Sequence, residues 1–272
     1  MNDALDPIRD QYRASGLLER IRTALAAFGR EDQLLTPEQL SALDQFHSRG
    51  LAATVDLARL AGIGRDMRVL DVGSGIGGPA RFLSATVGCK VTGVDLSEAF
   101  VEASRYLTER TGQGGRVAFQ AASALDLPFE RASFDAVLLQ HVAMNIKERT
   151  RLYQEIRRVL AVGGKFATFD VVSNGGEPLF PVPWARLAAM SHLMTAAGTR
   201  EAVEASGFRT LVFQDDTASV ADWFGKMRAN GLPPSPNLSL LMGPDFPQLA
   251  ANLGRSLMEG RLGILTAVFE AI

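Results

Sequence analysis

The chain has 272 residues, of which 47% are hydrophobic and 21% charged, and its formal net charge is -2. This length suits one large α/β domain with a lid, and the charge lacks the basic excess that nucleic-acid binding requires. Because Cys89 is the only cysteine, no intramolecular disulfide can form, and we expect a reducing, cytoplasmic location. The first residues do not resemble a signal peptide, and no apolar run is long enough to span a bilayer.

Helices are expected to open the chain. Residues 8–28 carry apolar side chains at helical spacing. A second helix is predicted from Thr36 as N-cap, with Pro37 at its first position and Gln39 completing a capping box. This helix runs towards residue 60, either continuously or with a break at Gly50. We predict that residues 1–62 form an N-terminal helical cap segment.

From residue 63 onwards, short strands alternate with helices. Strands are predicted at 68–72, 91–94, 117–120, 134–139 and 165–172, with helices at 79–86, 97–110 and 147–160 between them. Such alternation indicates right-handed βαβ units and a parallel sheet with helices on both faces. The predicted fold class is therefore α/β: a Rossmann-like, doubly wound, mostly parallel sheet with N-terminal helices and an inserted lid.

The pattern is less regular after residue 172. Residues 173–198 fit a lid inserted over the sheet edge, followed by a short helix and a strand at 210–213. Residues 217–260 form a predicted helical excursion, in which the proline-rich stretch 231–247 is expected to be a loop. A last strand follows at 262–269, and the long excursion permits it to pair antiparallel. We assign residues 63–272 to one core domain that carries both insertions.

A glycine-rich loop follows the first strand, at residues 71–78 (DVGSGIGG). Its glycines let the backbone turn sharply and approach a ligand at the carboxyl ends of the strands. Gly73, Gly75 and Gly78 also satisfy the dinucleotide pattern G-x-G-x-x-G, which alone is a weak signal. Asp95, at the end of the second strand, suits a pair of ribose hydroxyls with either kind of ligand.

Asp71 distinguishes the two ligand classes. A carboxylate beside the loop would repel a pyrophosphate, but it would attract an ammonium or a sulfonium group. This favours S-adenosylmethionine, which has both cations and no phosphate, over a nicotinamide dinucleotide. An alternative role for Asp71 is to cap the amides of its own loop.

The segment from residue 69 to 169 resembles the class I S-adenosylmethionine-dependent methyltransferases. It is similar to the branch that includes the ubiquinone/menaquinone-biosynthesis, tocopherol and sarcosine/dimethylglycine methyltransferases. The motifs that carry the resemblance are, in order, VLDVGSGIGG (69–78), VTGVDLS (91–97), ALDLPF (124–129) with SFDAVLLQHV (133–142), and RRVLAVGGKF (157–166). The resemblance implies an enzyme that moves a methyl group from S-adenosylmethionine to a small, partly apolar acceptor and leaves S-adenosylhomocysteine. It implies no metal, and a monomer or homodimer.

The resemblance also implies which residues surround the methionine part of the cofactor. Gly73, Ser74 and Gly75 would pass against it, and Asp71 would lie near its amino group. Gln140, at the end of the fourth strand, would face the methionine carboxylate or the sulfonium.

Other residues would surround the nucleoside part. Asp95 would hold the ribose hydroxyls, Leu96 would lie against the adenine, and Ala124 and Leu125 would flank the base. Ser123 departs from the family pattern, which usually has an aspartate there to accept from the adenine amino group. A hydroxyl is a weaker acceptor than a carboxylate.

The chain has three histidines, and a histidine is the natural general base near neutral pH. His141, directly after Gln140, is the first candidate, and His47 is the second. The alternative for both is a structural role in packing or hydrogen bonding. His192 is expected on the lid surface.

An apolar set accompanies the lid and suits an adaptable acceptor cavity, although packing of the lid onto the sheet is the alternative. Its members are Phe180, Pro181, Pro183, Trp184, Met190, Leu193, Met194, Trp223, Phe224 and Met227. Tyr12 is a further candidate for contact with the cofactor or the acceptor. Two other functions stay open: a nicotinamide-dependent oxidoreductase, and a non-catalytic S-adenosylmethionine-binding regulatory module.

Overall fold

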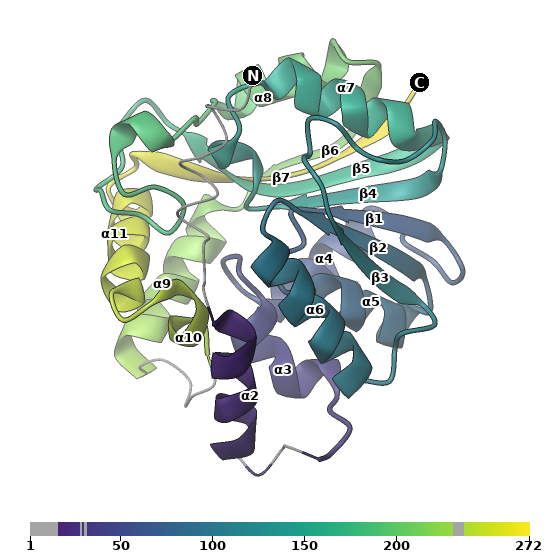
Figure 1. Cartoon of the computed structure of the whole chain (residues 1–272). Helices are drawn as coiled ribbons and strands as arrows, with labels where there is room; N and C mark the ends of the chain where they lie inside the picture. Colours follow the sequence, from purple (N-terminus) through teal and green to yellow (C-terminus); the bar gives the residue numbers. More distant parts are fainter. Residues whose placement is uncertain (1–15, 28, 30–31, 231–236) are drawn as a thin grey trace.

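A computed structural model describes residues 16–27, 29, 32–230 and 237–272. Its centre is a seven-stranded sheet in the order β3-β2-β1-β4-β5-β7-β6 (Figure 1). The strands are β1 (Arg68–Val72), β2 (Lys90–Asp95), β3 (Val117–Ala121), β4 (Phe134–Gln140), β5 (Leu160–Ser173), β6 (Phe208–Asp215) and β7 (Leu262–Ala271). The first five strands run parallel, and β7 pairs antiparallel with both β5 and β6. The predicted Rossmann-like fold, with its antiparallel last pair, is confirmed.

Helices cover both faces of this sheet (Figure 1). One face carries α7 (Arg149–Val159) and α8 (Ala196–Glu204), and the other carries α4 (Leu51–Leu60), α5 (Gly78–Val87) and α11 (Phe246–Met258). Each strand therefore needs apolar side chains on both sides, which explains why the central strands read as nearly continuous apolar runs.

Strand β4 shows how the two layers share one strand. Ala136 and Leu138 belong to the apolar cluster on the α5 side, whereas Val137 and Leu139 belong to the cluster on the α7 side. All four are buried, because successive side chains of a strand point to opposite faces. The strand thus ends at Gln140 between two filled layers, which fixes the position of that residue.

Before β1, the described part of the chain forms α2 (Leu17–Ala27), α3 (Pro37–Asp44) and α4. The predicted capping box is confirmed: the Gln39 backbone N–H donates to Thr36 Oγ1 at 3.4 Å, and the Thr36 N–H donates to Gln39 Oε1 at 2.9 Å. Residues 8–15 of the first predicted helix, and Tyr12 with them, lie outside the described residues.

The second predicted helix is divided in two, and the break between its halves is longer than Gly50 alone. Residues 45–50, here called the cap turn, are not helical and separate α3 from α4. Arg49 and Gly50 have positive φ angles of 61° and 49°, which an α-helix does not accommodate. The cap turn brings polar side chains to the carboxyl end of the sheet.

The excursion between β6 and β7 contains α9 (Thr217–Asn230), α10 (Ser239–Met242) and α11. The prediction of a loop over 231–247 is wrong in part, because α10 lies within it and α11 already begins at Phe246. Leu241 joins the apolar cluster formed by α2 and α6 (Glu98–Arg110), and this burial stabilises a turn of helix that the nearby prolines disfavour. No helix in the described ranges is long and apolar enough to cross a membrane.

Candidate active site

A cavity of about 810 Å³ opens at the carboxyl ends of β1, β2 and β4. Its walls come from the glycine loop, the cap turn, the segments after β3 and β4, the lid insertion, and the helices α9 to α11. Of the predicted site residues, the following line it: His47, Gly73, Gly75, Asp95, Leu96, Ser123, Ala124, Leu125, Gln140 and His141. Asp71 and Ser74 lie buried behind this wall, 2% and 5% exposed. The structure thus brings the predicted residues together around one space.

The glycine loop is packed too closely to admit side chains. Gly73 has a φ of 71°, and a Cβ there would lie 2.3 Å from Val142 Cγ2. The N–H groups of Gly73 and Ser74 both donate to the carbonyl of Val94, at 2.8 and 3.0 Å. The alternative role proposed for Asp71, capping these amides, is therefore wrong, because β2 already satisfies them.

Asp95 ties the glycine loop to the end of β2. Its Oδ2 accepts from the N–H of Gly75 and its Oδ1 from the N–H of Ser97, both at 2.9 Å. Burial raises the pKa of Asp95 to about 6, although these backbone donors lower it. Each carboxylate oxygen keeps a further lone pair. Asp95 can therefore hold the loop and accept from two ligand hydroxyls at the same time.

Several buried polar atoms at this end of the sheet have no hydrogen-bond partner among the described residues. They are Asp71 Oδ2, Ser74 Oγ, and both amide atoms of Gln140. Burial raises the pKa of Asp71 to about 7, and the negative charge of Asp95 adds to this effect. Buried polar groups in native proteins normally have partners. A ligand that presents an ammonium and a carboxylate here would supply them, so these residues fit the methionine part of S-adenosylmethionine.

The two candidate histidines have different surroundings. Both nitrogens of His47 have partners: Nε2 is 3.1 Å from Thr54 Oγ1, and Nδ1 is 3.4 Å from the carbonyl of Ser48. His141 Nε2, in contrast, is buried without a partner among the described residues. The ring of His141 stacks on Phe169 at 5.2 Å and lies 6.2 Å from the ring of His47. His141 is therefore the better candidate for exchanging a proton with a ligand.

His141 is also held in an unusual backbone conformation. Its φ is 53°, and its N–H donates to the carbonyl of Phe169 at 2.8 Å. Asp170 Oδ2 accepts from the N–H of Ala143 at 2.8 Å and so fixes the turn that follows. Positive φ in a residue other than glycine is uncommon and concentrates at functional sites. Burial lowers the pKa of His141 to about 3 and that of His47 to about 4, so both rings are neutral at pH 7.

The cap turn supplies site residues that the sequence did not reveal. Gln45 and Ser48 line the cavity, are 3% and 4% exposed, and leave Nε2 and Oγ without partners among the described residues. Both residues belong to the segment 45–50 (QFHSRG), in which no periodicity indicates which side chains point inward. These two donors can serve the same polar ligand groups as Gln140.

The far wall of the cavity is apolar. Of the predicted apolar set, Pro183, Trp184, Trp223, Phe224 and Met227 line the cavity. Others pack against the core instead: Phe180, Met190 and Leu193. His192, expected on the lid surface, lies at the cavity rim and is half-buried. Within the described ranges, no group of His, Cys, Asp or Glu side chains could hold a metal ion.

Comparison with known proteins agrees with this geometry. Residues 70–168 match the methyltransferase domain family. Sarcosine/dimethylglycine N-methyltransferase of Halorhodospira halochloris is 30% identical over 61% of this chain and 60% of its own length. O-methyltransferase resE of Aspergillus sclerotiorum is 33% identical over 54% of this chain and 56% of its own. The chain thus matches less than two thirds of either relative.

The fold is shared over a longer stretch than the sequence. Geranyl diphosphate C-methyltransferase of Streptomyces coelicolor A3(2), solved with Mg²⁺, geranyl-S-thiolodiphosphate and S-adenosyl-L-homocysteine, superposes with a TM-score of 0.74 at 17% identity. The superposition covers 100% of this chain and 99% of the other. The match at residues 70–168 and these relatives confirm the predicted resemblance to the class I S-adenosylmethionine-dependent methyltransferases.

Proposed function

We propose that this protein transfers a methyl group from S-adenosylmethionine to a small-molecule acceptor. The observation that carries the proposal is the combination of a glycine loop held by Asp95 with the unpartnered polar atoms of Asp71 and Gln140. When bound, S-adenosylmethionine supplies an electrophilic methyl group on a sulfonium. Asp95, Leu96 and Ser123 to Leu125 would hold its nucleoside, and the residues beside the glycine loop would hold its charged end.

The chain's contribution to catalysis is alignment and exclusion of water. Displacement from a good leaving group needs the nucleophile held in line and close, and a base only if the nucleophile carries a proton. His141, neutral and beside Gln140, would take that proton. Although the pKa of His141 is low, a hydroxyl oxygen that is being methylated becomes far more acidic than an imidazolium. A weak base therefore suffices.

The acceptor proposed here is uncharged and largely apolar. Trp184, Trp223 and Phe224 face it, and the cations at the described cavity wall have acidic neighbours. Arg49 pairs with Asp56 at 2.7 Å, and Lys226 pairs with Asp222 at the same distance. Lys147 is exposed at the rim directly before Glu148. Arg49 and Lys226 are thus already paired and Lys147 is exposed to solvent, so none of the three is a buried, free cation that could hold a phosphate or carboxylate of the acceptor.

Asp95→Ala should weaken binding of S-adenosylhomocysteine at least tenfold while the protein stays folded. The change removes charge-assisted hydrogen bonds to the ribose, each worth about 1.5–3 kcal/mol, and frees the loop amide of Gly75. Calorimetry measures the dissociation constant, and Asp222→Ala, which changes a carboxylate on α9, is the matched control. An unchanged constant in a folded variant would place the site elsewhere.

The same calorimetry tests the proposed function itself. We expect micromolar binding of S-adenosylhomocysteine and no measurable binding of NAD, because Asp71 and Asp95 oppose a pyrophosphate. Tighter binding of NAD would favour the oxidoreductase alternative. Cofactor binding without turnover of any acceptor would favour a regulatory module.

Affinity for S-adenosylhomocysteine should also rise as the pH is raised from 6 to 8. With a pKa of about 7, Asp71 is largely protonated at pH 6. The ammonium of the ligand favours the ionised carboxylate, so affinity should gain up to about tenfold per pH unit below this pKa. Calorimetry at pH 6, 7 and 8 measures the slope, and Asp71→Asn should flatten it. A slope that persists in this variant would assign the titration to another group.

A further inference from the structure

The loop between β3 and β4 forms the side of the cavity next to Asp95. Its residues 122–125, here called the base-side wall, line the cavity. The wall begins where the N–H of Ala122 donates to the carbonyl of Asp95 at 3.0 Å. Inside it, the N–H of Leu125 donates to Ser123 Oγ at 3.2 Å. The first bond joins the start of the wall to β2 beside the proposed nucleoside site, and the second lies within the wall, so neither attaches residues 123–125 to another element.

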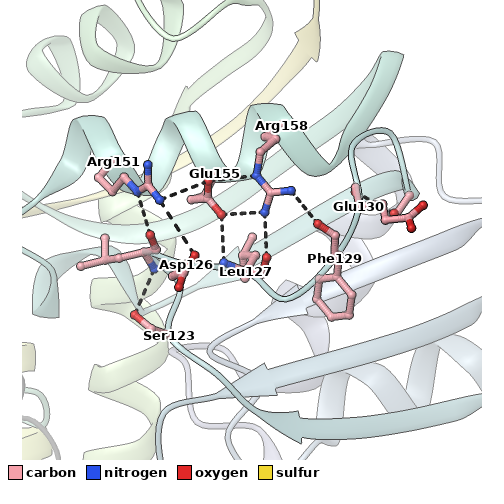
Figure 2. A network of polar contacts seen from close by, with 10 residues as sticks. Ser123, Asp126, Leu127, Phe129, Glu130, Arg151, Glu155 and Arg158 are labelled. Carbon is pink, nitrogen blue, oxygen red and sulfur yellow. Dashed lines mark hydrogen bonds and ion pairs between the residues drawn. The ribbon is translucent and has the colours of Figure 1, made fainter.

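Side chains of α7 make that attachment from behind (Figure 2). Arg151 Nε donates to the carbonyl of Leu125 at 2.8 Å. Glu155 Oε2 accepts from the N–H of Leu127 at 2.9 Å, and Arg158 Nη2 donates to the carbonyl of the same residue at 2.7 Å. Both backbone groups of Leu127 are therefore held by one helix.

Glu155 and Arg158 form the centre of this network. Arg158 donates to Glu155 through Nε at 3.0 Å and through Nη2 at 2.7 Å, a bidentate geometry. Its Nη1 donates to the carbonyl of Phe129 at 2.6 Å. Glu155 is only 4% exposed, and hydrogen bonding from Arg158 holds its pKa below the ordinary value. The pair is thus a fixed, ionised clamp on an irregular loop.

We propose that Glu155 and Arg158 are positioning residues for the cofactor: they hold the base-side wall in the conformation that receives the base. This inference rests on the proposed function, because it needs a nucleoside in the cavity. Neither residue lines the cavity. They act by keeping most molecules in the wall conformation that binds the cofactor. If the fraction of molecules in that conformation falls, the apparent dissociation constant of the cofactor rises by the same factor.

Two conservative substitutions test the proposal. Glu155→Gln removes the charge, and Arg158→Lys removes the fork that reaches Leu127 and Phe129. Each should raise the dissociation constant of S-adenosylhomocysteine about tenfold. Because the wall faces only the nucleoside, the constant of 5′-methylthioadenosine, which lacks the amino-acid end, should rise by the same factor. Amide exchange at Leu127 should speed up in both variants and slow again when S-adenosylhomocysteine is bound.

The matched control is Ile156→Val, on the same helix. Ile156 is fully buried against the sheet, so the change costs about 0.5–1.5 kcal/mol of stability without touching the loop. Measured well below all melting temperatures, it should leave both dissociation constants unchanged. If a general loss of stability were the cause, the dissociation constants of all three variants would rise alike.

The outcomes are separable. If the wild-type protein binds neither ligand, the proposed function fails. If the wild type binds both but folded Glu155→Gln and Arg158→Lys bind them as tightly, the positioning role is overturned and the proposed function stands. If only S-adenosylhomocysteine weakens, the clamp does not act through the base-side wall, which also overturns the inference.

Discussion

His141→Ala should lower the single-turnover rate of methyl transfer by about 10²–10⁴-fold, the range typical of a lost general base, with no change in affinity for S-adenosylhomocysteine. His141 lines the cavity, and its Nε2 has no partner among the described residues, whereas both nitrogens of His47 do. The rate is measured with an acceptor found by screening uncharged phenols and other apolar hydroxyl compounds. His192→Ala, at the rim, is the matched control.

A second variant separates the base from the backbone. Because His141 has a positive φ, we expect His141→Asn, whose side chain tolerates that conformation, to stay folded and to lose the same activity. If His141 has only a structural role, activity should fall only as far as the folded fraction of the protein falls. Full activity in either folded variant would leave catalysis to alignment alone.

The pH dependence follows from the low pKa of the two rings. The pKa of His141 is lowered to about 3 and that of His47 to about 4, against an ordinary value of 6.5. The unfolded chain therefore binds more protons than the folded one between these values. Stability from the neutral rings is complete above pH 6.5 and is lost as the pH falls towards 4. The rate of transfer, measured at saturating cofactor, should therefore show no histidine ionisation between pH 6 and 8.

Arg81→Ala should lower the free energy of unfolding by about 3–5 kcal/mol, since it leaves a buried carboxylate without its partner. Arg81 Nη2 and Asp44 Oδ2 are 2.8 Å apart, and both side chains are 0% exposed. Arg81 also donates to the carbonyl of Ser104 at 3.2 Å. Urea denaturation measures the loss, and Arg116→Ala, which removes an exposed pair with Asp66, should cost below about 1 kcal/mol.

The double variant Arg81→Met with Asp44→Leu sharpens this test. Replacing both charges by apolar side chains should recover most of the lost stability. A loss under 1 kcal/mol for Arg81→Ala would show that α3 and α5 are held together by other contacts. The pair joins the helix before the cap turn to the helix after the glycine loop, so affinity for S-adenosylhomocysteine should fall in the single variant as well.

The parallel half of the fold could be predicted because its signals are local. Buried strands, the glycine loop and the capping box at Thr36 each act over a few residues, and the capping box is present as predicted. The existence of α10 could not be predicted, because burial of Leu241 against α2 and α6 overrides the nearby prolines. The start of α11 was missed because Pro247 was taken as a loop signal, whereas it stands in the first turn of the helix, where proline is tolerated.

The same distinction applies to the site. Asp95, Gln140 and His141 were predicted because sheet topology fixes where strands end. Gln45 and Ser48 were missed because they lie in an irregular turn, whose direction depends on contacts of Asp44 with α5. The interpretation of Asp71 as a cap failed for a related reason, since the competing acceptor, the carbonyl of Val94, belongs to the neighbouring strand.

The place of β7 in the sheet has a consequence for synthesis. β6 comes before β7 in the chain, yet within the described sheet β7 is its only neighbour, and β7 also separates it from β5. A nascent chain that ends before β7 therefore exposes the long apolar edge of β5 and has no partner for β6. Open edges of this kind favour pairing between chains. On the ribosome, this protein is most vulnerable to aggregation just before its last strand emerges.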